Sequence, residues 1–143
     1  MSRKTRKRRP KQPPAEETSA EKAKQAYGRS RKCLHHDDFD GASQAIGEAL
    51  ALDPAYPNAE NLAGWILLKL PRPTQVQLER ALAHFHEAVR LEPHAPAPVL
   101  NVGEALVALG REVEAIVWME SLIARDQFKP EALNWLGWHW AFR

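Results

Sequence analysis

The chain has 143 residues, of which 44% are hydrophobic and 27% are charged, and its formal net charge is +2. This length suits one domain, and the hydrophobic content allows a substantial core. The sequence contains no run of about 18 apolar residues, which a membrane-spanning helix would need. Its basic beginning leads into polar, proline-containing sequence instead of the apolar stretch of a signal peptide. We therefore expect a chain with no membrane segment that resides in the cytoplasm, or in the nucleus of a eukaryote.

The charge is divided unequally along the chain. Residues 1–32 hold twelve Lys and Arg and three Glu, a net charge of +9, whereas residues 33–143 hold eight basic and fifteen acidic side chains, a net charge of −7. Residues 1–17, the basic arm, have no apolar residue after Met1 except Ala15, so we expect them to be disordered. Order is expected to begin at Thr18, because Thr18 and Glu21 have the spacing of a helix capping box.

From residue 19 onward the sequence predicts helices only. Apolar residues recur at helical spacing, and prolines or other turn residues separate the runs. The predicted helices are 19–34, 38–52, 56–69, 74–91, 96–109, 112–125 and 130–142.

These helices repeat with a period close to 34 residues. One small residue recurs in every first helix of a pair, at separations of 34, 39 and 34 residues: Ser30, Gly64, Gly103 and Gly137. The second helices carry two residues seven apart with a larger one between them: Ala42, Ile46 and Ala49, then Ala81, Phe85 and Ala88, then Ala115, Met119 and Leu122. Small residues let two helix backbones approach closely, while the larger side chain fills the space beside them.

The pattern resembles the tetratricopeptide repeat (TPR) family, whose helix-turn-helix unit has 34 residues. The resemblance covers about residues 20–143 and rests on "NLAGWILL" and "ALNWLGWHW" as first helices, "FDGASQAIGEALALDP" and "ERALAHFHEAVRLEP" as second helices, and "LGREVEAI" as a turn. It implies an all-α, right-handed superhelical solenoid of antiparallel helix pairs. The TPR domain would span residues 18–143, with units at about 20–54, 55–93 and 94–127 and a terminal helix at 130–142.

Three departures from the family pattern stand out. The second unit has five additional residues around "KLPRPTQ", which predict a longer turn between its helices. Gln127 stands where Pro54 and Pro93 end the earlier units. Arg29 and Cys33 occupy places where the family usually has larger apolar residues, so the register of the first helix is left open.

The resemblance implies a concave groove lined by the first helices, where a partner peptide would bind. The residues that the family register places there are Tyr27, Arg31, Asn58, Asn61, Trp65, Leu68, Leu100, Asn101, Glu104, Val107, Asn134, Trp138 and Ala141. Tryptophan is a common anchor in interfaces, and asparagine can pair with a peptide backbone as both donor and acceptor. The alternative interpretation is that these are solvated asparagines and packing tryptophans.

Two specialised sites of TPR relatives are not expected in this chain. The clamp that binds the carboxylate tail of heat-shock chaperones needs Lys, Asn and Arg, but its places hold Tyr27, Arg31, Leu62, Ala97 and Asn101. The asparagine ladder of sugar-transferring relatives would need an asparagine at the sixth place of each unit, and only Asn101 meets that requirement.

The basic arm carries seven cationic side chains: Arg3, Lys4, Arg6, Lys7, Arg8, Arg9 and Lys11. These charges could attach to an acidic protein, or to the phosphates of a nucleic acid with salt-dependent affinity. No aromatic residue lies among them, so stacking on bases is not expected. A nuclear import signal in a eukaryote and a merely solvated terminus are the other interpretations.

The sequence does not predict catalysis, a metal or a cofactor. His35, His36, Asp37 and Asp38 have metal-binding side chains but lie at a predicted turn, without the spacing of a known site. His84 and His86 are two residues apart on a helix, so they point away from each other. Cys33 is the only cysteine, which excludes an internal disulfide and a cysteine-based zinc cluster. The glycines are scattered singly and form no phosphate-binding loop.

The last helix is rich in aromatic residues, and the period assigns them different roles. Leu133, Leu136, Gly137 and Trp140 fall at packing places, and Trp138 falls at a groove place. Trp135 and Phe142 have no predicted inward role. We hypothesise that they form a terminal interaction surface, used for self-association or for a helix of a partner.

We interpret the chain as a protein-interaction adaptor or scaffold that binds a peptide or helix in the groove and an acidic partner through the basic arm. One alternative is a nucleic-acid- or ribonucleoprotein-associated protein whose arm binds phosphates. A second alternative is a chaperone similar to those of type III secretion translocators, which share the small size and the apolar groove.

Overall fold

The computed structural model describes residues 9–141, and helices are the only regular secondary structure over that range. Its helices are α1 (Ser19–His35), α2 (Phe39–Leu52), α3 (Pro57–Leu68), α4 (Gln75–Leu91), α5 (Pro96–Ala108), α6 (Glu112–Ala124) and α7 (Lys129–Ala141). The predicted all-α fold is confirmed, and the predicted helix ends agree with the observed ones to within about one residue. None of the described helices is both long and apolar enough to cross a membrane.

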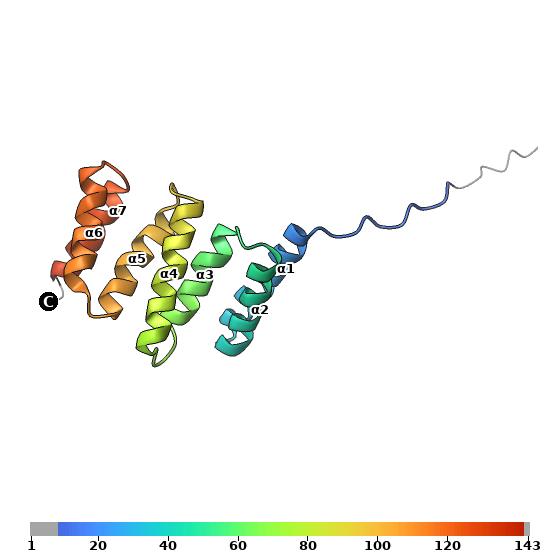
Figure 1. Ribbon diagram of the computed structural model, residues 1–143, viewed down its shortest axis with the longest axis horizontal. Coiled ribbons are helices and arrows are strands. Elements are labelled where there is room, and N and C mark those ends of the chain that lie inside the picture. The colour runs from blue at the N-terminus through green and yellow to red at the C-terminus, as the bar shows by residue number, and fades with distance from the viewer. Residues whose placement is uncertain (1–8, 142–143) are drawn as a thin grey trace, which may run out of the picture.

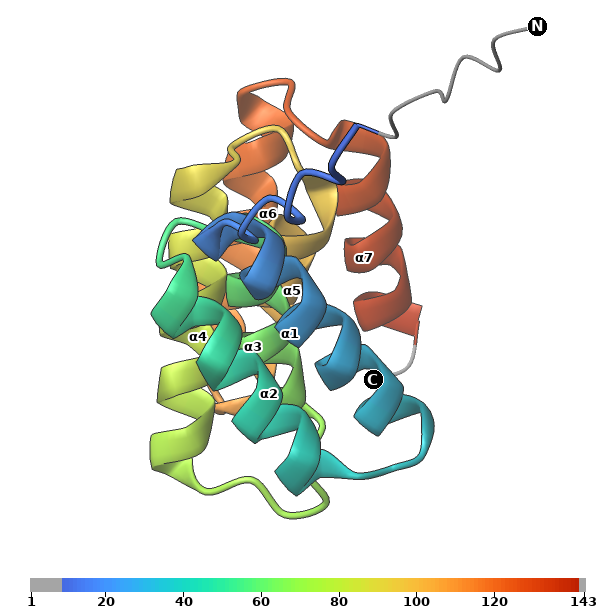
Figure 2. The same ribbon diagram turned by 90° about the vertical axis from the view of Figure 1, so that its right-hand side faces the viewer.

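The helices stand side by side in a row that follows the order of the chain (Figure 1). Each helix packs on the next one, and α5 also packs on α3 and α7. Figure 2, which looks along the row, shows α1 and α7 toward one side and α2 and α4 toward the other. Antiparallel helix pairs therefore stack into a solenoid, as the 34-residue period predicts.

The second helices bury the residues that the period selected. Ala42, Ala49, Ala81, Ala88 and Ala115 are completely buried, and the larger residues between them lie within the three apolar clusters of the core. Each cluster contains side chains from more than one helix pair, so the core runs continuously along the row. This is the arrangement that the small-large-small spacing predicts for a stacked repeat.

Small residues of α1, α3 and α5 also lie at helix crossings. The Ser30 hydroxyl is completely buried and donates a hydrogen bond of 2.9 Å to the carbonyl oxygen of Ala42. A Cβ atom on Gly64 would lie 2.7 Å from the Phe85 ring, and one on Gly103 would lie 2.3 Å from the Met119 Cε atom. A side chain at Gly64 would therefore collide with a buried ring and with backbone, whereas one at Gly103 would require the flexible end of Met119 to move.

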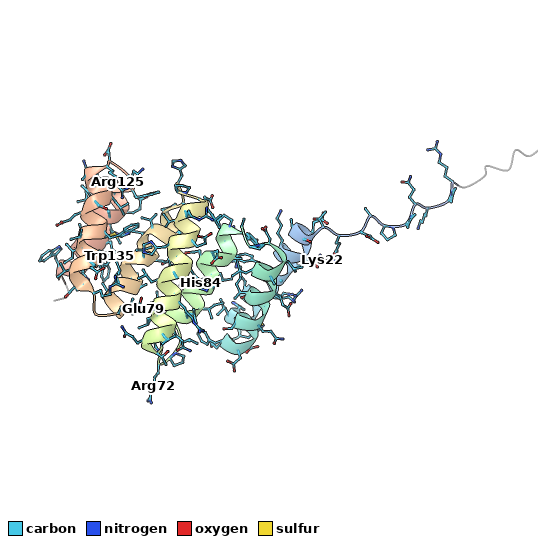
Figure 3. All side chains as sticks on the ribbon, in the orientation of Figure 1. Lys22, Arg72, Glu79, His84, Arg125 and Trp135 are labelled. Carbon is cyan, nitrogen blue, oxygen red and sulfur yellow. The ribbon has the colours of Figure 1, made fainter. Side chains whose placement is uncertain are left out.

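Local side-chain chemistry fixes where two of the helices begin. The predicted capping box is present: Thr18 Oγ1 accepts from the Glu21 amide at 3.2 Å, and Glu21 accepts from the Thr18 amide at 2.8 Å. The same arrangement joins Thr74 and Gln77 at the start of α4. The connection before α4 spans residues 69–74, which is the longer turn predicted from its prolines, and Arg72 projects from it (Figure 3).

Three helices end in a Schellman motif, in which one residue adopts the left-handed conformation. That residue is Asp37 after α1, Gly110 after α5 and Asp126 after α6, with φ between 54° and 75°. After α6, the Asp126 amide donates to the Ile123 carbonyl at 3.0 Å, and the Gln127 amide donates to the Leu122 carbonyl at 2.9 Å. The ends of α2 and α4 differ, because Pro54 and Pro93 follow their capping residues directly.

The predicted packing of α7 is wrong by one residue. Leu133, Gly137 and Trp140 are exposed, whereas the residues facing the core are Ala132, Trp135, Leu136 and His139. These positions follow the inward residues of α5 by 33 places and not by the expected 34. The physical reason is the Schellman motif: α6 ends and α7 begins one residue earlier than the proline-terminated units imply. One residue turns a helix by about 100°.

Candidate peptide-binding site

Two asparagines link the first helices in the middle of the solenoid. The Asn101 Nδ2 atom on α5 donates a hydrogen bond of 3.0 Å to the Asn61 Oδ1 atom on α3, and both side chains are partly buried. This pairing uses one donor of Asn101 and the acceptor of Asn61. Each side chain keeps further capacity, because an amide has two N–H donors and an oxygen with two lone pairs. Residue spacing alone did not indicate that these two asparagines bind each other.

The N-terminal part of the predicted groove is aromatic. Tyr27 on α1 lies against Tyr56, which precedes α3, with ring centroids 5.4 Å apart and planes tilted by 48°. Both rings also pack on the first apolar cluster. Burial raises the pKa of Tyr56, and the nearby Tyr27 and Asp53 add to that effect. Tyr27 is therefore a half-buried packing residue with one exposed edge, while Arg31 on the same helix is exposed.

The predicted groove residues of α3 divide between core and surface. Trp65 and Leu68 are half-buried and pack on the central apolar cluster, so they contribute to stability as well as to the surface. Asn58, at the start of the same helix, is exposed. Val107 of α5 also packs on this cluster, whereas Ala141 at the end of α7 is exposed.

Four of the predicted groove residues meet in one pocket between α5 and α7, which we call the α5–α7 pocket. It has a volume of about 340 Å³ and opens to the surface. Its lining residues are Leu100, Glu104, Glu131, Asn134, Trp135 and Trp138. Leu100, Glu104, Asn134 and Trp138 had been selected by the repeat register, whereas Glu131 and Trp135 had not. Trp138 is 63% exposed and is one of the lining residues.

Trp135 holds this pocket in shape, contrary to its predicted role as an exposed surface residue. Its indole N–H donates a hydrogen bond of 2.7 Å to Glu104 Oε1, and its ring stacks on His139 with centroids 4.9 Å apart. His139 in turn pairs with Glu112 on α6 at 2.6 Å. Trp135, which is labelled in Figure 3, and His139 therefore tie α7 to α5 and α6 respectively. Phe142, the other predicted member of the terminal surface, lies outside the described residues.

The outer side of α7 presents apolar groups that the shifted register turned away from the core. Leu133 is 50% exposed and Trp140 is 58% exposed. A shallow depression on this helix is lined by Leu133, Asn134, Gly137, Trp138 and Ala141. This side of α7 is separate from the α5–α7 pocket, although Asn134 and Trp138 lie on the boundary between them.

The layer of second helices has two pockets that the sequence did not predict. One, of about 350 Å³, lies between α4 and α6 and includes His86, Trp118 and the exposed Val113 and Val117. His86 meets the Trp118 ring edge to face, and burial together with the nearby Arg111 lowers its pKa. The other, of about 190 Å³, lies between α2, α3 and α4, where His84 pairs with Glu60 at 2.6 Å (Figure 3).

Two other groups of predicted residues are only partly described or carry no site. Arg9 and Lys11 of the basic arm are exposed, whereas Arg3, Lys4, Arg6, Lys7 and Arg8 lie outside the described residues. His35 and His36 contact each other edge to face at the end of α1. Within residues 9–141, no group of three or more His, Cys, Asp or Glu side chains is placed to hold a metal ion. Cys33 is half-buried and unpaired by a disulfide.

Comparisons with known proteins place this geometry in context. The sequence model described as "Tetratricopeptide repeat" matches residues 74–136. The TPR2B domain of yeast Sti1, in its pHsp70 complex, superposes with a TM-score of 0.64 at 18% identity, over 73% of this chain and 80% of that chain. A mutant O-GlcNAc transferase of Thermobaculum terrenum superposes with a TM-score of 0.65 at 19% identity, over 76% of this chain but only 20% of the transferase chain. No curated protein matches the sequence.

Proposed function

We propose that the chain, whose residues 74–136 match a tetratricopeptide repeat model, is a protein-interaction adaptor that binds a peptide segment of a partner along its first helices. The observation that carries this proposal is the α5–α7 pocket, where the exposed ring of Trp138 stands beside Leu100, Glu104 and Asn134. An exposed tryptophan next to an open pocket is typical of an interface anchor, because it buries much area with little loss of rotamer freedom.

The central asparagine pair supports the same proposal. Asn61 and Asn101 lie next to each other on neighbouring first helices and retain donor and acceptor capacity. An extended peptide that crosses these helices would meet amide groups in the middle and an apolar pocket toward α7. Backbone pairing with side-chain anchoring in a pocket is a common way to recognise an extended peptide.

The Sti1 structure contains a pHsp70 complex, yet the same kind of ligand is not part of our proposal. Tyr27, Leu62 and Ala97 stand at three places where chaperone-tail binders have polar clamp residues. None of these three side chains carries a charge that would bind a terminal carboxylate. We therefore propose that the partner is recognised by an internal segment.

The test of this proposal is selection from a library of phage-displayed 12-residue peptides on the immobilised full chain. Affinities of the selected peptides are then measured by fluorescence anisotropy. We expect Trp138→Ala to weaken binding by about 10-fold or more, a typical loss for an interface anchor. Trp140→Ala is the matched control, because Trp140 lies on the same helix with similar exposure but does not line the pocket.

Two results would contradict the proposal. One is a selection that enriches no peptide. The other is equal binding by the W138A and W140A variants, which would show that the α5–α7 pocket is not the recognition site. Circular dichroism of both variants checks that each remains helical. Trp65 is unsuitable for this test because it packs on the core, so its removal would also change stability.

The basic arm adds a second contact in this proposal, with an acidic surface of the partner. A second candidate function of the basic arm is to bind the phosphates of a nucleic acid. The net charge of +9 over residues 1–32 favours it. A gel-shift series with a 30-nucleotide single strand over increasing salt separates the two. Affinity that falls steeply with salt and disappears when residues 1–14 are deleted would support the nucleic-acid function. Unaltered affinity after that deletion would remove it.

A further inference from the structure

The α5–α7 pocket combines apolar walls with negative charge. Leu100, Trp135 and Trp138 supply the apolar surface, and Glu104 and Glu131 place two carboxylates on opposite helices of the same pocket. None of the described residues that line it is basic. A ligand that fits this surface therefore needs both apolar contact area and positive charge.

Neither carboxylate has an ion-pair partner of its own among the described residues. The ion pairs within residues 9–141 use six other glutamates: Glu48, Glu60, Glu79, Glu87, Glu112 and Glu114. Five of these six lie on second helices, whereas Glu104 and Glu131 lie on first helices and are not ion-paired over the described part of the chain. Their carboxylates are therefore available to a cationic group of a ligand.

Glu104 is also held in a fixed position. One of its oxygens accepts the indole N–H of Trp135, whose ring is held in turn by His139 and, through it, by Glu112. A carboxylate that already accepts one hydrogen bond still has lone pairs for a second donor. Because the chain of contacts fixes Glu104 before any ligand arrives, binding to it loses little side-chain entropy.

Trp138, which is 63% exposed, adds aromatic surface to the pocket. A guanidinium group stacks well on an indole ring and presents several N–H donors in one plane, which suit carboxylate acceptors. A lysine ammonium offers the charge without the plane. The aliphatic stem of an arginine would lie along apolar surface of the kind that Leu100 provides.

We propose that the α5–α7 pocket binds an arginine side chain of a partner peptide, with an aliphatic residue next to it. This inference rests on the proposed peptide-binding function and specifies its ligand. Glu104 and Glu131 pair with the guanidinium group, Trp138 stacks on it, and Leu100 contacts the neighbouring aliphatic side chain. The ligand is opposite in charge to the carboxylate tail that the clamp of some TPR proteins binds.

The test uses the full chain and two fluorescein-labelled probes of nine residues, GSGLRLGSG and the same peptide with citrulline in place of arginine. Citrulline has nearly the shape of arginine but no charge, so the pair isolates the cation. We expect the arginine probe to bind at least 10-fold more tightly than the citrulline probe at 50 mM salt. That advantage should shrink as salt rises to 300 mM, because the carboxylates are partly exposed.

Variants assign the charge to specific side chains. E131Q should lower the affinity for the arginine probe about 10-fold and change the affinity for the citrulline probe by less than 2-fold. E104Q should have the same effect. Glu120→Gln is the matched control, since Glu120 is an exposed glutamate on α6 that does not line the pocket. A double-mutant cycle between probe and variant gives the coupling of each carboxylate to the guanidinium.

Equal binding of the two probes overturns the arginine inference. If both probes also lose affinity with W138A, the peptide-binding function stands while the charge preference is wrong. If neither probe binds at 1 mM, the arginine inference fails as well, and the library selection decides separately on the peptide-binding function. A synthetic peptide of residues 1–14 that binds at least 10-fold more tightly than the arginine probe would assign the pocket to the basic arm of a second copy and overturn the assignment to a partner.

Discussion

Replacement of Gly64 by alanine is a sensitive probe of how closely α3 and α4 pack. The added methyl group would lie 2.7 and 2.8 Å from two ring atoms of Phe85 and 3.0 Å from the carbonyl oxygen of Ala81. Carbon atoms in contact normally stand about 3.5–4.0 Å apart. Phe85 is completely buried, so its ring has no solvent-filled space into which it can retreat. The two helices would therefore have to move apart.

The expected loss of stability follows from two opposing effects. Overpacking of a core costs about 2 kcal/mol at the middle of its usual range, while alanine in place of a mid-helix glycine gains about 0.5–1 kcal/mol, so we expect a net loss of about 1 kcal/mol. For a chain of this size, that loss lowers the melting temperature by about 2–6 °C. Thermal and urea unfolding, followed by circular dichroism, measure both quantities.

The matched control for Gly64 is Gly137, an exposed glycine within α7. A Cβ atom there meets nothing within 4 Å, so Gly137→Ala should raise the free energy of unfolding by about 0.5–1 kcal/mol. In the G64A background, Phe85→Leu should cost less than it does in the wild type, because the smaller side chain relieves the contact. A G64A variant as stable as the wild type would refute the reasoning.

Three further predictions concern the C-terminal half. Trp135→Phe removes the hydrogen bond to Glu104 and should lower the free energy of unfolding by about 0.5–1.5 kcal/mol. Amide hydrogen exchange in α7 should become faster. Unchanged exchange there would show that this bond does not hold α7. Burial lowers the pKa of His86, so the unfolded state binds a proton more readily than the folded state does. The free energy of unfolding of the wild type, relative to that of His86→Gln, should therefore fall as the pH drops below about 6.5. Urea titrations at pH 7.5 and 5 measure this, and parallel curves would contradict it. Gln127→Pro removes the donor to Leu122 and disfavours the left-handed residue before it, so it should lower the free energy of unfolding by about 1–3 kcal/mol, whereas Gln127→Ala should change it little.

Much of the fold could be predicted because its core depends on local spacing. Ala42, Ile46 and Ala49 share a helix face whatever the neighbouring helix does, and all three are buried. Thr18 and Glu21 form their capping box from bonds within four residues of chain. Such features require only the geometry of one helix.

The candidate site was predictable only in part, because it depends on contacts between helices. The repeat register selected Leu100, Glu104, Asn134 and Trp138, and these four line one pocket. It gave no indication that Asn61 and Asn101 bind each other, since their hydrogen bond joins residues forty positions apart. The distance between two side chains on different helices is set by packing, which a single sequence pattern does not specify.

The packing of α7 shows how a small change in one turn redistributes the roles of three tryptophans. The sequence signal is Gln127, which stands where Pro54 and Pro93 end the earlier units. The structure supplies the consequence: without the proline, α6 ends in a Schellman motif and α7 begins one residue early. Trp135 then packs against the core, while Trp138 borders the pocket and Trp140 lies outside it. Under the expected register, Trp140 would have been the core residue, and Glu104 would have lacked the indole donor that now fixes it. The pocket between α5 and α7 is therefore a product of the turn at Asp126 as much as of the residues that line it.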